Sequence, residues 1–179
     1  VCLPTEKISD GLTYTVRFKR ASRYFLLPVA VAKHISIDNF PCFVRVEADR
    51  GEDVGVVEAC VRSENFMLAP QTAGFRGRGF SSTHGVLKWM FGPASHAEIL
   101  QLREKVEDEN DALAVIREKV AYRNLAMKVI DCEYQFDRHK LSFFYEAPKR
   151  IDFRDLVSEL FCLYKTRIWM QQVDTTNHN

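Results

Sequence analysis

Three carboxylates near the C-terminal end of the chain have the residue types needed for metal-dependent chemistry. Asp131, Glu133 and Asp137 alternate along one run of residues, so they are expected on the same side of a strand. Carboxylate oxygens bind Mg²⁺, which can orient a water molecule for phosphodiester cleavage. Acidic residues are also common on the solvent-facing side of an antiparallel strand. A metal-dependent endoribonuclease site is therefore one hypothesis.

A second group mixes aromatic and basic side chains on two neighbouring runs. With Ile168 and Met170 turned inward, alternation directs one set of side chains to the opposite, open face. This set is Lys140, Ser142, Phe144, Arg167, Trp169 and Gln171. Aromatic rings on an open sheet stack unpaired RNA bases, while Arg, Lys and Gln bind phosphates or base edges. The alternative is that this face packs on the rest of the chain or on a second subunit, with Trp169 as an interface anchor.

Other arginines extend this hypothesis. Arg154 and Arg167 are expected to contact phosphate, and the alternative for both is an internal ion-pair network. Arg76 and Arg78 alternate with glycines in GFRGRGF (74–80), which is typical of a flexible arm that contacts RNA. A solvated linker without a binding role would have the same composition.

The elements that position these residues are predicted from hydrophobic periodicity. Apolar alternation around 130–136 and 141–145, with a polar break between, predicts an antiparallel hairpin in which Phe136 pairs with Leu141. That register turns Ile130 toward the core. Asp152 is placed to cap a helix over 153–164, and a last strand follows over 166–173.

A long amphipathic helix is predicted upstream, from a Ser95-x-x-Glu98 capping box to about residue 123. Glu109 interrupts its apolar row, which is Ile99, Leu102, Val106, Leu113, Ile116 and Val120. One end of this helix could project toward a partner helix, and two shorter helices broken near Asn110 would also fit.

The order of elements predicts an α+β fold. A strand over 86–91 followed by the long helix, the hairpin, the second helix and the last strand gives βαββαβ. This is the ferredoxin-like arrangement, in which two helices cover one face of a four-stranded antiparallel sheet. Short strands with turn residues before it predict a small SH3-like β barrel. We expect a β-rich lobe over 1–62, a linker over 63–85 and the ferredoxin-like domain over 86–174.

Composition excludes several classes of protein. The net charge of +1 is too small for nucleic-acid binding driven by charge alone, so any polyanion site must be a local patch. The five cysteines are scattered singly, which disfavours disulfides and zinc, and we expect no metal and no cofactor. The sequence predicts no membrane span or signal segment, hence an intracellular, cytoplasmic protein. Because it begins at Val1, the chain is expected to be part of a longer protein.

Several motifs resemble a known family. RIDFRDLV (150–157), KTRIWMQQV (165–173) and IDCEYQFDRHKLSFFY (130–145) are similar to the polymerase-suppressor-protein C-terminal conserved region, including its YaaT-like bacterial members. YTVRFKRASRYFLLP (14–28) and VRVEADRGEDVGVVE (44–58) resemble that family's opening strands. The resemblance covers about 11–173 and includes an E-x-x-R-G-x-x-x-G turn at Glu47, Arg50, Gly51 and Gly55.

The resemblance implies RNA biology. Protozoan members of the family are associated with short mRNA elements, and bacterial members act in RNA processing together with small helical partners. The bacterial proteins carry a cysteine-rich stretch linked to an iron–sulfur cluster just after the segment that matches 165–173. This chain has TTNHN (175–179) nearby instead, so the resemblance favours the mRNA-binding branch without a cluster.

We therefore expect a non-catalytic module that binds single-stranded mRNA in mRNA processing or turnover. A domain that dimerises or assembles an RNA-processing complex, through the long helix or the sheet face, is the first alternative. The endoribonuclease is the second.

Overall fold

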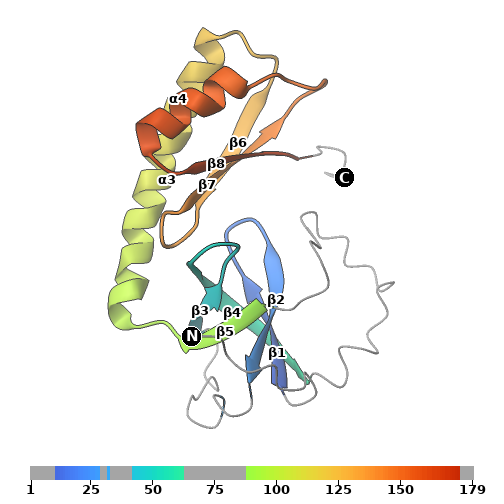
Figure 1. The fold of residues 1–179 in the computed structure, drawn as a ribbon, viewed down its shortest axis with the longest axis vertical. Coiled ribbons are helices and arrows are strands. Elements are labelled where there is room, and N and C mark those ends of the chain that lie inside the picture. The colour runs from blue at the N-terminus through green and yellow to red at the C-terminus, as the bar shows by residue number, and fades with distance from the viewer. Residues whose placement is uncertain (1–10, 29–31, 33–41, 63–87, 174–179) are drawn as a thin grey trace. The chain divides into compact units, whose positions relative to one another are not determined.

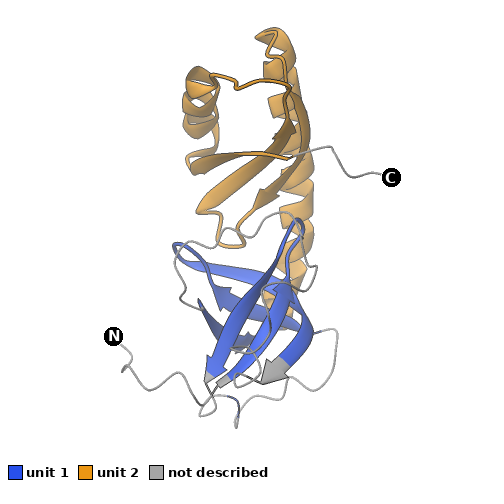
Figure 2. Cartoon of the chain, turned by 90° about the vertical axis from the view of Figure 1, so that its right-hand side faces the viewer, with its two compact units in different colours: residues 1–95 blue, residues 96–179 orange. Residues whose placement is uncertain are grey.

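The structure is a computed structural model that describes residues 11–28, 32, 42–62 and 88–173 (Figure 1). The chain divides into two compact units, residues 1–95 and 96–179, which Figure 2 colours separately. The first unit contains a closed five-stranded barrel and the second a three-stranded sheet with two helices. The predicted α+β class, with a β lobe ahead of a βαββαβ order of elements, is confirmed.

The barrel strands are β1 (Gly11–Arg17), β2 (Ser22–Pro28), β3 (Phe43–Glu47), β4 (Glu52–Arg62) and β5 (Lys88–Pro93). They pair in the order β1-β2-β5-β3-β4, and antiparallel pairing of β1 with β4 closes the barrel. Alternate side chains fill its interior, as small barrels require. The buried set is Tyr14, Val16, Phe25, Leu27, Val44, Val46, Val57 and Met90.

Two glycines of the family-like turn have structural roles in this barrel. Gly51 adopts φ 81° in the turn between β3 and β4, a conformation that favours glycine. Gly55 lies where β4 crosses close to β1, and a Cβ there would stand 2.5 Å from Val16 Cγ1 and 2.8 Å from the Arg17 carbonyl oxygen. The two glycines of the motif are therefore explained by folding of the barrel.

Strand β5 belongs to a different sheet from the one expected. It was expected as the fourth strand of the C-terminal sheet, but it pairs in the barrel, parallel to β2 and antiparallel to β3. Met90 of β5 is buried in the barrel core. The C-terminal sheet consequently has three strands in the order β6-β7-β8, with β7 and β8 parallel. The expected linker over 63–85 lies outside the described residues.

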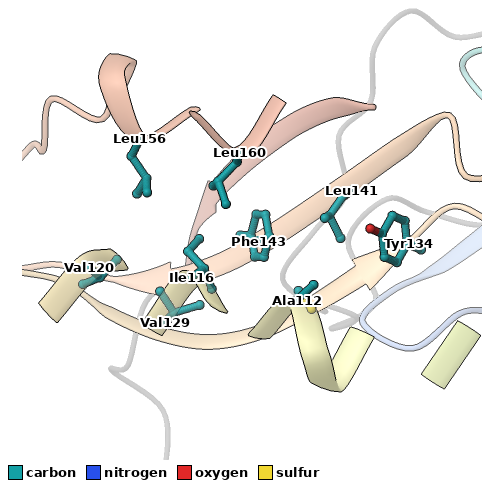
Figure 3. Packing of buried hydrophobic residues seen from close by; sticks show 10 residues of the cluster. Ala112, Ile116, Val120, Val129, Tyr134, Leu141, Phe143, Leu156 and Leu160 are labelled. Carbon is teal, nitrogen blue, oxygen red and sulfur yellow. The ribbon is translucent and has the colours of Figure 1, made fainter. Parts of the chain in front are cut away.

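The second unit contains α3 (His96–Tyr122), β6 (Lys128–Tyr134), β7 (Lys140–Glu146), α4 (Arg154–Tyr164) and β8 (Arg167–Gln172). Both helices contribute to one core on the sheet. Figure 3 shows Ile116 of α3 and Leu160 of α4 close to Phe143, which is fully buried. Burying each such side chain stabilises the fold by roughly 1.5–3 kcal/mol. No helix in the described ranges is long and apolar enough to cross a membrane.

The hairpin register differs from the prediction. Tyr134, and not Phe136, pairs with Leu141, so the connecting turn is longer than the four polar residues expected. A register shift at Ile130 then places Val129 in the core, only 3 % exposed. The bulge inserts one extra residue into the strand, which simple alternation does not reveal.

Helix α3 is continuous, so the alternative of two helices broken near Asn110 is wrong. Its buried positions are Lys105, Glu109, Ala112, Ile116 and Val120, while Val106 from the expected row is 52 % exposed. Glu109 is buried because its Oε1 accepts a hydrogen bond from the Tyr134 backbone N–H at 2.8 Å and lies 3.4 Å from Lys105 Nζ. Glu109 therefore belongs to the packed face of the helix.

Candidate functional site

The sheet of the second unit has one face packed on the helices and one opposite face. The register between β7 and β8 places Lys140 beside Arg167, Ser142 beside Trp169, and Phe144 beside Gln171. These six residues alternate with the core residues of their strands, so they share the face opposite the helices, as the sequence pattern predicted. We call this surface the open face.

The part of the open face that β7 and β8 expose is basic and aromatic. Trp169 is 48 % exposed, and the Arg167 guanidinium carbon lies 5.5 Å from the centroid of its indole ring. This distance is within the range of a cation–π contact. Lys140, partly exposed, lies beside Arg167 on the neighbouring strand. We call Lys140, Arg167 and Trp169 the basic–aromatic strip.

Phe144 does not provide a second accessible ring. Its side chain is only 7 % exposed, and Ser142 on the same strand is 8 % exposed. Strand β7 is the middle strand, so its open-face side chains are flanked by residues of β6 and β8 on both sides. Phe144 can support its neighbours on this face but offers little surface for stacking a base.

The three predicted carboxylates lie in two different settings. Asp131 and Glu133 are on the open face of β6, opposite Phe144 and Ser142. Asp137 lies in the turn, where it accepts hydrogen bonds from Gln135 Nε2 at 2.6 Å and from the His139 backbone N–H at 3.0 Å. Across the described ranges, no three His, Cys, Asp or Glu residues are grouped as a metal ion would require. The geometry thus gives the nuclease hypothesis no assembled site.

Arg154 forms an exposed ion pair at the start of α4. Its Nη2 lies 2.6 Å from Asp152 Oδ2, and its Nε lies 3.0 Å from Asp152 Oδ1. The hydrogen bonds from Arg154 lower the pKa of the Asp152 carboxyl. Asp152 also accepts the Arg154 backbone N–H at 3.2 Å, although the N-cap residue itself is Phe153. A phosphate at Arg154 would have to share the guanidinium with the Asp152 carboxylate or displace it from this exposed pair.

Arg76 and Arg78, the arginines of the predicted flexible arm, lie outside the described residues.

The β6–β7 turn is anchored by a residue that the sequence reading missed. Arg138 adopts φ 64°, its Nη2 lies 2.6 Å from Asp108 Oδ2, and its guanidinium carbon is 4.8 Å from the Tyr134 ring centroid. Its carbonyl accepts a hydrogen bond from Thr166 Oγ1, the residue just before β8. Burial, the largest cause, raises the pKa of Tyr134 to about 12. An arginine in a polar turn carries no sequence signal for this anchoring role.

The comparisons with known proteins agree with the family-like motifs of the sequence. Residues 88–173 match the family described as the PSP1 C-terminal conserved region. The chain belongs to this family. It is 30 % identical over 161 residues to the stage 0 sporulation protein YaaT of Bacillus subtilis, covering 88 % of this chain and 51 % of that protein. The family resemblance inferred from the motifs is thereby confirmed.

Two fungal relatives extend the comparison. A Schizosaccharomyces pombe protein described as uncharacterized is 40 % identical over 152 residues, which is 78 % of this chain and 20 % of that protein. Protein PSP1 of Saccharomyces cerevisiae is 56 % identical over 46 residues, 26 % of this chain and 6 % of PSP1. The chain therefore spans about half or less of each of these relatives. No solved structure matches it.

Proposed function

We propose that this chain is an intracellular module that binds single-stranded mRNA through the open face of its C-terminal sheet, in mRNA processing or turnover. The observation that carries the proposal is the basic–aromatic strip, where the half-exposed Trp169 ring forms a cation–π contact with Arg167. An exposed ring can stack an unpaired base, and the adjacent guanidinium can bind the next phosphate.

The charges on the open face suggest how the strand would lie. Asp131 and Glu133 on β6 repel phosphates, whereas Lys140 and Arg167 attract them. We expect the RNA backbone to follow the β8 side, with base edges directed toward β6. Carboxylates on that side can accept hydrogen bonds from the exocyclic amines of bases.

A titration of the chain into a labelled, unstructured RNA tests the proposal. Trp169→Ala should weaken binding roughly 5- to 150-fold, because one stacked base contributes roughly 1–3 kcal/mol. The matched control is Phe161→Ala, which removes another exposed aromatic ring, on α4. Equal affinities of the wild type and the Trp169 variant would refute base stacking at this site.

Salt dependence tests the phosphate contacts separately. Replacing Arg167 by Gln should reduce the slope of log affinity against log salt by about 0.7 if the arginine contacts one phosphate. Including Mg²⁺ and checking strand integrity in the same samples tests the nuclease alternative, for which cleavage would be the deciding result.

A role in protein assembly is the second candidate. Phe161 and Leu163 of α4 are 52 % and 54 % exposed, and because they are two residues apart on a helix, each would form a separate apolar contact with a partner. A stable complex that forms equally well with and without RNA, and is lost on replacing Phe161 and Leu163 by serine, would favour this role over RNA binding.

A further inference from the structure

The two edge strands of the C-terminal sheet differ in what their outward backbone groups bind. Along β6, the guanidinium of Arg117 donates to the carbonyl oxygens of Val129 and Ile130, both at 3.2 Å. Glu109 accepts the outward N–H of Tyr134 on the same strand. On the opposite side, β8 pairs with β7 alone, and no strand of the described ranges lies beyond it.

The hydrogen-bonding groups on this edge can be assigned to residues. The Val173 N–H donates to the Tyr145 carbonyl at 2.8 Å, so Val173 directs its backbone groups toward β7. Successive residues of a strand direct these groups alternately to its two sides. Trp169 and Gln171 therefore also pair with β7, while Ile168, Met170 and Gln172 present an N–H and a C=O to the free edge.

Within its own six residues, strand β8 has few of the features by which natural edge strands avoid pairing. Its sequence, RIWMQQ, contains no proline and no lysine. Its register with β7 continues through six successive pairs without a bulge. An edge that is regular, apolar in its centre and only singly charged is suited to accept another strand.

We infer that β8 pairs antiparallel with β8 of a second copy of this chain, about a twofold axis at Trp169. Residues that face each other across such a pair lie on the same side of the sheet. Trp169 then faces Trp169 of the other copy, and Arg167 faces Gln171. This register forms an aromatic cross-strand pair and keeps the two arginines apart, so the strand is complementary to itself.

The consequence is one continuous six-stranded sheet with two basic–aromatic strips side by side on its open face. This inference goes beyond the proposed function and does not depend on it, because self-association is measured without RNA.

Sedimentation of the chain over a range of concentrations tests the inference. The wild type should dimerise, and Gln171→Arg should weaken the dimer roughly two- to thirty-fold, because it places like charges opposite each other at two symmetric positions. Gln171→Glu should strengthen it. The matched control is Gln172→Arg, which adds the same charge opposite Thr166 and should have a smaller effect. A chain that stays monomeric, or equal effects of the two arginine variants, would overturn the inference.

Hydrogen exchange locates the interface independently of substitutions. The amides of Ile168 and Met170 should gain protection as the concentration rises, whereas those of Trp169 and Gln171 should already be protected by β7. If a dimer forms and the Ile168 and Met170 amides exchange at an unchanged rate, the copies associate elsewhere and the inference fails.

Discussion

The barrel and the three-stranded sheet satisfy their backbone groups in different ways. In the barrel, each of the five strands pairs on both sides, so hydrogen bonds between strands complete the structure. In the C-terminal sheet, β6 depends on side chains of α3, and β8 has no described partner on its outer side. The stability of the barrel should therefore fall when a side chain is added where two strands lie close together. The stability of the sheet should fall when one of a few polar side chains is removed.

Removing the buried carboxylate should have the largest effect. Glu109→Ala leaves Lys105 without its ion-pair partner and the Tyr134 N–H without an acceptor. Breaking a buried pair in this way costs about 3–5 kcal/mol, and denaturant unfolding of the second unit should show that loss. Glu107→Ala, an exposed position on the same helix, is the control. A loss below about 1 kcal/mol would contradict the importance assigned to this edge.

A methyl group at Gly55 should damage the barrel but spare the sheet. Gly55→Ala places a Cβ against Val16 and the Arg17 carbonyl, and overpacking of this kind costs about 1–3 kcal/mol. Residue-resolved hydrogen exchange should show faster opening of β1 and β4 alone. Ala59→Ser, an exposed site on the same strand, should change the stability by less than about 0.5 kcal/mol. Equally faster hydrogen exchange in the barrel and in the C-terminal sheet would show that the two units do not respond independently.

The arginine on the β6 edge should have an intermediate effect. Arg117→Ala removes two hydrogen bonds to carbonyls of β6, and we expect the free energy of unfolding to fall by about 1–2 kcal/mol. Arg117→Lys should recover part of the loss, since one ammonium group cannot reproduce the fork of the guanidinium. If the lysine variant unfolds at the same denaturant concentration as the wild type, the fork geometry does not matter.

The smallest effect is expected from the link between the two helices. Lys119 of α3 and Arg123, which follows the end of that helix, both pair with Glu159 of α4, and these hydrogen bonds lower the pKa of Glu159 below its usual 4.5. Its stabilising contribution is therefore present above about pH 4.5 and is lost as the pH falls through the lowered pKa. Glu159→Gln should be less stable than the wild type at pH 7 and equal to it at strongly acid pH. A difference that persists in acid would rule out this linkage.

The sequence predicted those features that follow from regular alternation. The open-face positions on β7 and β8, including Arg167 and Trp169, were correct because both strands keep an uninterrupted period of two. The bulge at Ile130 was missed since an extra residue shifts the period without changing composition. Glu109 was expected to interrupt the buried row of its helix, but it is buried because it accepts a hydrogen bond from the Tyr134 backbone N–H, 25 residues away.

The accessibility of the candidate site was also beyond sequence reasoning. Phe144 follows the same alternation as Trp169, yet it lies on the middle strand and is buried, whereas Trp169 lies on the edge and is half exposed. The order of strands in a sheet depends on pairing between residues far apart in the sequence. For the same reason, the sequence did not reveal that β5 pairs with β2 and β3 in the barrel.

The position of β5 separates the start of the family region from the boundary between the two compact units. The family region begins at residue 88, the first residue of β5, but β5 lies between β2 and β3 and completes a barrel whose other four strands precede that region. If the chain were cut at the start of the family region, the C-terminal fragment would carry β5 without its barrel partners. The N-terminal fragment would be an open barrel in which β2 and β3 each have one unpaired edge. Recombination or truncation at that boundary should therefore yield two defective pieces, whereas a cut after Ser95 would respect both units.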